Sequence, residues 1–148
     1  ELPLLAEAGV GLVGENRTDQ LAAKQVAYPG RFTWDFIGHL QSRKARDVVG
    51  RVRLVHALES DSVAAAIERQ ATSPQAVLVQ VNTARDPGKY GLLPEELDAF
   101  LERLAGLERV AVRGLMTMPA LAIVWFARDQ FRLEKSPPGV ASLGHTWR

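Results

Sequence analysis

The regular alternation of short apolar segments with amphipathic ones constrains the fold of this chain more than any other feature. Apolar runs typical of strands occupy residues 10–13, 32–37, 53–58, 76–81, 110–118 and 140–143. Helical spacing covers residues 2–8, 17–26, 41–49, 61–70, 93–107 and 125–135. Strands joined by helices run parallel with right-handed crossovers, so the pattern predicts an α/β fold with a parallel sheet. An open doubly wound sheet and a (β/α)8 barrel both satisfy it.

Composition excludes several classes of protein. The 148 residues, 47% hydrophobic, are enough for one core, so we expect a single domain over residues 1–148. A net charge of +1, from 18 basic and 17 acidic residues, argues against a nucleic-acid-binding protein. The lack of cysteine excludes disulfides and fits a cytoplasmic protein, and no segment has the ~18 apolar residues of a membrane span. The first residue is Glu1 rather than Met, which suggests that the sequence begins inside a longer gene.

Local signals mark the core and the helix starts. Trp34 and Phe36 lie in an aromatic, apolar run and are predicted to be core residues. Ser42 is the predicted N-cap of the helix over residues 41–49. Asp61 or Ser62 is predicted to cap the alanine-rich helix that follows.

Polar residues and glycines gather where the predicted strands end. The ends carry GEN at residues 14–16, GHLQ at 38–41, an asparagine at 82, MTMP at 116–119 and SLGHT at 142–146. The carboxyl ends of parallel strands meet at one edge of a sheet, where α/β proteins form their binding sites. A ligand site is therefore predicted at this edge.

The motifs in these segments resemble those of a known family. GEN at residues 14–16, WDFIGHLQSRK at 34–44, VLVQVN at 77–82, KYG at 89–91 and RGLMTMP at 113–119 occur in the family's order and spacing. They resemble the YggS/PROSC family of pyridoxal phosphate (PLP) homeostasis proteins, which are related to the N-terminal barrel of alanine racemase. The resemblance implies a (β/α)8 TIM-type barrel that holds PLP at the carboxyl ends of its strands. In this sequence the barrel is expected to be incomplete, with its first and eighth strands missing.

The resemblance also implies a set of cofactor-binding residues and no catalytic residue, and no two histidines share metal-ligand spacing with a carboxylate, so no metal site is predicted. The cofactor-binding residues are Asn16, Gly38, His39, Met116, Ser142, Gly144 and Thr146, the last three forming the phosphate loop. Each has a structural alternative: Asn16 could cap a helix and Met116 could pack in the core. His39 has no evident acidic partner in the sequence, which favours a structural histidine, and His56 is expected to be buried in a strand and hydrogen-bonded.

The implied function is binding and delivery of PLP inside the cell, with PLP-dependent apo-enzymes as candidate partners and no clear catalysis. The family's Schiff-base lysine should precede Glu1, and none of Lys24, Lys44, Lys89 and Lys135 inherits its role. Two alternatives stay open, an inactive fragment of the family and a racemase-like PLP enzyme. The intact family is monomeric, whereas open barrel edges here would favour self-association and weak binding of PLP.

Overall fold

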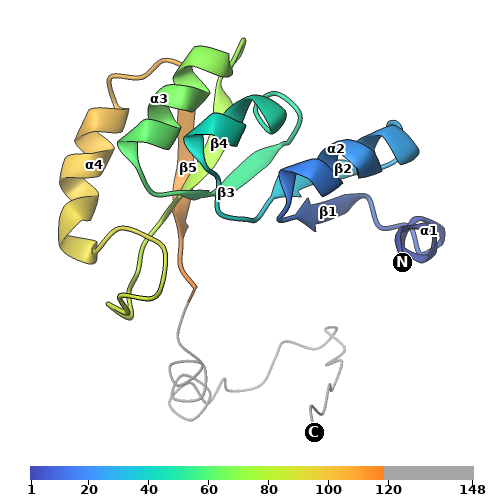
Figure 1. Cartoon of the computed structure of the whole chain (residues 1–148), viewed down its shortest axis with the longest axis horizontal. Helices are drawn as coiled ribbons and strands as arrows, with labels where there is room; N and C mark the ends of the chain where they lie inside the picture. Colours follow the sequence, from blue (N-terminus) through green and yellow to red (C-terminus); the bar gives the residue numbers. More distant parts are fainter. Residues whose placement is uncertain (119–148) are drawn as a thin grey trace, which may run out of the picture. The chain divides into compact units, whose positions relative to one another are not determined.

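Five parallel strands form one sheet in the part of the chain that the computed structural model describes, residues 1–118 (Figure 1). The strands are β1 (Leu12–Glu15), β2 (Thr33–Phe36), β3 (Leu54–Leu58), β4 (Gln75–Gln80) and β5 (Val110–Met116). Their spatial order β1-β2-β3-β4-β5 follows the chain order, and every adjacent pair is parallel. These described strands therefore show none of the order reversal that defines a doubly wound sheet.

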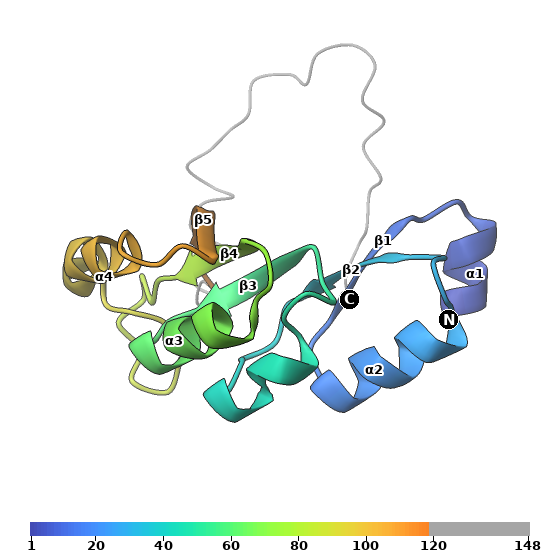
Figure 2. The same ribbon diagram turned by 90° about the horizontal axis from the view of Figure 1, so that it is seen from above.

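Helices cover one face of this sheet. They are α1 (Leu2–Glu7), α2 (Thr18–Ala27), the 3₁₀ helix η1 (Ser42–Asp47), α3 (Asp61–Gln70), the 3₁₀ helix η2 (Pro94–Glu96) and α4 (Leu97–Leu104). Figure 2 shows α2, α3 and α4 on the same side of the strands, as repeated right-handed crossovers require. All the carboxyl ends of the strands consequently lie at one edge.

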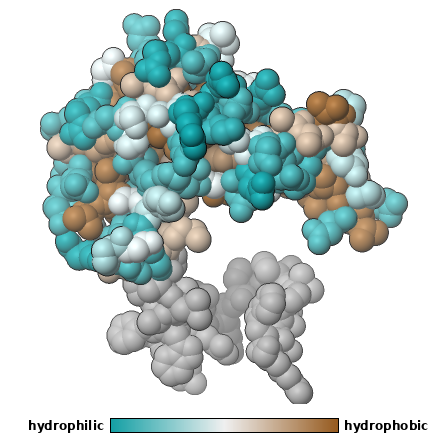
Figure 3. Space-filling view, in the orientation of Figure 1, coloured by the Kyte–Doolittle hydropathy of each residue, from teal (hydrophilic) through white to brown (hydrophobic). Residues whose placement is uncertain are grey.

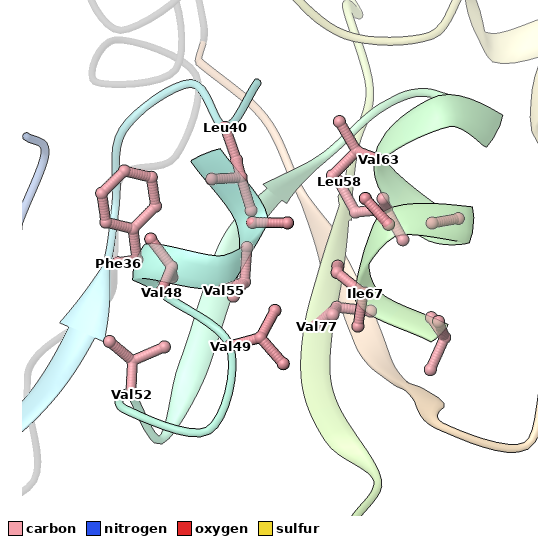
Figure 4. Close-up of a cluster of buried hydrophobic side chains, with 14 of the residues drawn as sticks. Phe36, Leu40, Val48, Val49, Val52, Val55, Leu58, Val63, Ile67 and Val77 are labelled. Carbon is pink, nitrogen blue, oxygen red and sulfur yellow. The ribbon is translucent and has the colours of Figure 1, made fainter. Parts of the chain in front are cut away.

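The core lies between the strands and these helices (Figure 4). Phe36 of β2, Val55 of β3 and Val77 of β4 are at most 1% exposed, and Ile67 of α3 packs against the same cluster. Trp34 and Phe36 are buried, which confirms the prediction for both. Burial of each large apolar side chain contributes about 1.5–3 kcal/mol relative to exposure.

The opposite face of the sheet exposes apolar side chains. Leu12 of β1 and Ile37 after β2 are 49% and 48% exposed. Leu4 of α1 is 68% exposed, and apolar surface gathers at this end of the chain in Figure 3. None of the helices within residues 1–118 is long and apolar enough to cross a membrane.

Several element boundaries differ from the predictions. Strand β1 begins at Leu12, two residues later than predicted, because the Val10 N–H donates to Leu5 O and so belongs to the end of α1. Strand β4 begins and ends one residue early, and β5 ends at Met116 rather than at residue 118. Helix α4 ends at Leu104, three residues before the predicted end.

Both predicted helix caps are wrong, by one or two positions. The segment after β2 is a 3₁₀ helix preceded by Gln41, and Ser42 is its first helical residue. Helix α3 is capped by Ser60, whose Oγ accepts from the Val63 N–H at 3.4 Å. Propensity locates a helix start only to within a residue or two, because Ser and Asp favour several positions of the first turn.

Candidate functional site

The carboxyl edge of the sheet brings together polar residues that follow different strands. Asn16 follows β1, Gly38 and His39 follow β2, and Glu59 follows β3. Asn82 lies just beyond β4, where its side chain bonds the Asp86 backbone at both the N–H and the carbonyl. Because both of these contacts hold the loop after β4, Asn82 is a structural residue.

Glu15, the last residue of β1, stabilises the turn that joins β1 to α2. Its side chain is buried, and Oε1 accepts from the Asn16 N–H at 2.8 Å and from the Arg17 N–H at 3.0 Å. Oε2 pairs with Nζ of Lys24 on α2. Burial by itself would raise the pKa of the Glu15 carboxyl, but Lys24 and the two backbone N–H groups together lower the pKa below its ordinary value.

Gly38 lets two turns of this edge approach each other closely. A Cβ at residue 38 would lie 2.8 Å from the Asn16 carbonyl carbon and closer still to its oxygen. No residue other than glycine fits against this backbone without displacing it. The GEN and IGHLQ motifs are therefore in direct contact through their main chains.

His39 has an acidic partner that the sequence did not reveal. Its Nδ1 lies 2.8 Å from Oε1 of Glu59, and its ring stacks on Tyr90 with centroids 4.0 Å apart and planes inclined by 14°. The prediction that His39 lacks an acidic partner is wrong. Glu59 directly follows β3, so the rule that sites form at strand ends would have included it.

Glu59 itself is held in an unusual environment. Its side chain is 12% exposed, and within residues 1–118 the buried Oε2 has no hydrogen-bond partner. Burial raises the pKa of the Glu59 carboxyl, and the His39 ring and the nearby Gly91 N–H offset only part of that rise. Glu59 and His39 thus form an acid–base pair at the edge where Asn16 lies.

The structure brings only some of the predicted residues together. Asn16 and His39 line one hollow of about 200 Å³ with Gln41 and Lys44. Met116 lines a different hollow of about 210 Å³, with Leu97 of α4 and Val81 after β4. Ser142, Gly144 and Thr146 lie outside the described residues, as do the predicted helix over residues 125–135 and strand over 140–143.

A second polar cluster lies farther down the strands. The buried Asp35 of β2 accepts from Arg53 Nε at 3.0 Å and NH2 at 2.6 Å, and its Oδ2 lies 3.0 Å from His56 Nε2. His56 is hydrogen-bonded as predicted, but it is only half-buried. Among residues 1–118, no three His, Asp or Glu side chains converge as metal ligands would.

A family model and curated relatives match most of this chain. The model described as alanine racemase, N-terminal domain, matches residues 2–136. A pyridoxal phosphate homeostasis protein of Aquifex aeolicus is 36% identical over 115 residues, which are 75% of this chain and 50% of the relative. A protein of the same name from Vibrio alginolyticus is 34% identical over 77% of this chain and 52% of its own length. The chain therefore spans about half the length of these relatives.

Solved structures agree with the sequence matches. PipY of Synechococcus elongatus, in a structure without PLP, superposes with a TM-score of 0.68 and 33% identity over 78% of this chain and 59% of PipY. Its structure with PLP bound gives a TM-score of 0.65 and 30% identity over 78% and 58%. The parallel α/β arrangement of the described residues is thus the one found in PipY.

Proposed function

Because the chain belongs to the alanine racemase N-terminal domain family, we propose that it binds PLP and takes part in PLP homeostasis inside the cell. The observation that carries this proposal is the match over residues 2–136, together with relatives named pyridoxal phosphate homeostasis protein. The PLP-bound structure of PipY supports the same cofactor. Delivery of PLP to apo-enzymes and a cytoplasmic location belong to this proposal.

The proposed architecture is one domain over residues 1–148 that contributes strands to a (β/α)8 barrel. The sequential strand order and the helices on one face of the sheet support it, because a barrel has both features. A barrel places its ligand at the carboxyl ends of the strands, which is the edge that carries Asn16, Gly38 and His39.

The proposed cofactor site uses residues from several strand ends. Its members are Asn16, Gly38, His39, Met116, Ser142, Gly144 and Thr146. The Asn16 amide would donate or accept a hydrogen bond beside the ring, and Gly38 lets the turn after β2 pack against the Asn16 backbone. When PLP is bound to family members, its aldehyde supplies imine chemistry with a lysine. In the described part of this chain, no lysine lies on a strand.

A PLP titration of the purified chain tests this function, followed by borohydride reduction and peptide mapping. The proposal predicts that PLP binds the chain saturably and that analogues of PLP compete for the same site. Exchange of D- and L-alanine would instead favour a racemase-like enzyme, and absence of saturable binding would favour a fragment without function of its own. An adduct fixed on one lysine would identify the residue that holds the aldehyde.

A further inference from the structure

We propose that Glu15, paired with Lys24, is a positioning residue that holds the Asn16 backbone in place for cofactor binding. The inference rests on the proposed function, in which Asn16 contacts the cofactor. It adds Glu15 and Lys24 to the proposed cofactor site as residues that support Asn16 and do not themselves contact the ligand. Their role follows from the turn between β1 and α2.

Glu15 fixes the two residues that lead into α2, which has no side-chain cap. Arg17 at the N-cap position makes no side-chain capping bond. Instead, one carboxylate oxygen of Glu15 accepts from two successive backbone N–H groups, those of Asn16 and Arg17. Bonds from N–H groups to an ionised carboxylate are stronger than neutral ones, so they restrict the backbone angles on both sides of Asn16.

Lys24 allows this carboxylate to stay ionised while buried. Glu15 is 6% exposed, and a buried carboxylate without a positive partner would be strongly destabilising. Lys24 lies on α2, where the helical pattern alone would leave its side chain in solvent. Its Nζ nevertheless pairs with Oε2 of Glu15. The pair therefore ties the end of β1 to the body of α2.

Asn16 is held on a second side by the turn after β2. Its carbonyl group packs against Gly38, where even a Cβ would not fit. The side chain of Asn16 is exposed and makes no hydrogen bond within residues 1–118, in contrast to its fixed main chain. A fixed backbone with an uncommitted amide is the arrangement that lowers the entropic cost of binding a ligand.

Four variants separate positioning from general stabilisation. Glu15→Ala removes all the contacts, and Lys24→Met removes only the positive charge. Glu15→Gln keeps an oxygen that can accept both N–H groups but turns an amide NH2 toward Lys24. The double variant Glu15→Gln/Lys24→Met removes that conflict and is the conservative rescue.

Amide hydrogen exchange by NMR is the readout that does not depend on any ligand. Exchange of the Asn16 and Arg17 amides should accelerate about tenfold or more in Glu15→Ala relative to core amides of β3 and β4. In the double variant it should return to within about threefold of the wild type. Unchanged exchange in Glu15→Ala would overturn the inference.

Equilibrium dialysis with PLP gives the second readout on the same proteins. Glu15→Ala should weaken PLP binding about tenfold, with recovery in the double variant. Borohydride reduction and peptide mapping of the wild type checks that Lys24 carries no adduct. Faster exchange with wild-type PLP affinity would overturn the positioning role. If the wild type binds no PLP, the proposed function fails, and the exchange result alone decides whether Glu15 holds the turn.

Discussion

At the scale of single residues, the buried Glu15 and the partly buried Glu59, both at the carboxyl ends of strands, have opposite electrostatic settings. Glu15 accepts two N–H bonds and pairs with Lys24, and its pKa is lowered. Glu59 has one oxygen with no partner among residues 1–118, and its pKa is raised by burial. Perturbed carboxyl pKa values are common at functional sites, because such sites combine burial with specific charge partners.

The two residues should therefore respond to pH in opposite directions. Glu15 contributes stability above its ordinary pKa of 4.5, and this is lost as the pH falls through its lower folded value. The contribution of Glu59 is greatest below 4.5 and is lost as the pH rises through its higher folded value. Urea unfolding of the wild type, Glu15→Gln and Glu59→Gln from acid to neutral pH measures both. If the two variants' differences from the wild type in unfolding free energy changed in the same direction with pH, the predicted opposite response would be wrong.

Gly38 gives a second prediction at this scale. Gly38→Ala should lower the free energy of unfolding by about 1–3 kcal/mol, because the added Cβ meets the Asn16 main chain and something must shift. Gly11→Ala is the matched control: a Cβ there meets no atom within 4 Å, and the change should stay within about 0.5 kcal/mol. Equal effects of the two substitutions in urea unfolding would show that the turns do not touch.

At the scale of elements, the helices differ in what fixes their first turn. Helix α3 has its N-cap at Ser60, whereas η1 and α2 begin without a side-chain cap of their own. Helix η1 follows a 3₁₀ path that carries Ala45, Val48 and Val49 into the core. Packing against the sheet decides its geometry, since short helices gain little from propensity alone.

The cap of α3 can be tested with two serines that are two positions apart, Ser60 and Ser62. Ser60→Ala should cost about 1 kcal/mol of unfolding free energy, because it removes the oxygen that accepts from the Val63 N–H. Ser62→Ala, at a position that the sequence favoured, should change it by less than about 0.5 kcal/mol. Chemical denaturation measures both, and a larger loss for Ser62→Ala would place the cap there instead.

At the scale of the whole molecule, the described sheet is covered by helices on one face and exposes apolar residues on the other. Leu12 of β1 and Ile37 after β2 are about half exposed on that other face. Exposed apolar surface and unpaired strand edges favour association with other chains. We therefore expect the isolated chain to self-associate through this face.

Sedimentation velocity over a range of concentrations tests this expectation. The weight-average mass should rise above the 16.2 kDa of one chain as concentration increases. Leu12→Lys should reduce the association, whereas Val26→Lys, on the helical side at a residue that is 81% exposed, should leave it unchanged. A single 16.2 kDa species at every concentration would rule out the association.

Most of the described fold was predictable from local patterns. Within residues 1–118 the apolar runs located each strand to within two residues, and their alternation with helices required a parallel sheet. The position of Asn16, Gly38 and His39 at one edge followed from the same rule, since each lies within three residues of a strand end. Local hydrophobic spacing is a property of the sequence itself, so it can be interpreted without knowing which segments meet.

Contacts between distant segments were decided only by the tertiary structure. The strand order distinguished a sequential sheet from a doubly wound one. The pairing of His39 with Glu59, the stacking of Tyr90 and the contact of Lys24 with Glu15 join residues that are 9 to 51 positions apart. Such contacts depend on how helices and loops pack across the sheet. Residue type and spacing do not specify that packing, and for this reason the sequence indicated the edge of the site but not the partners that hold it.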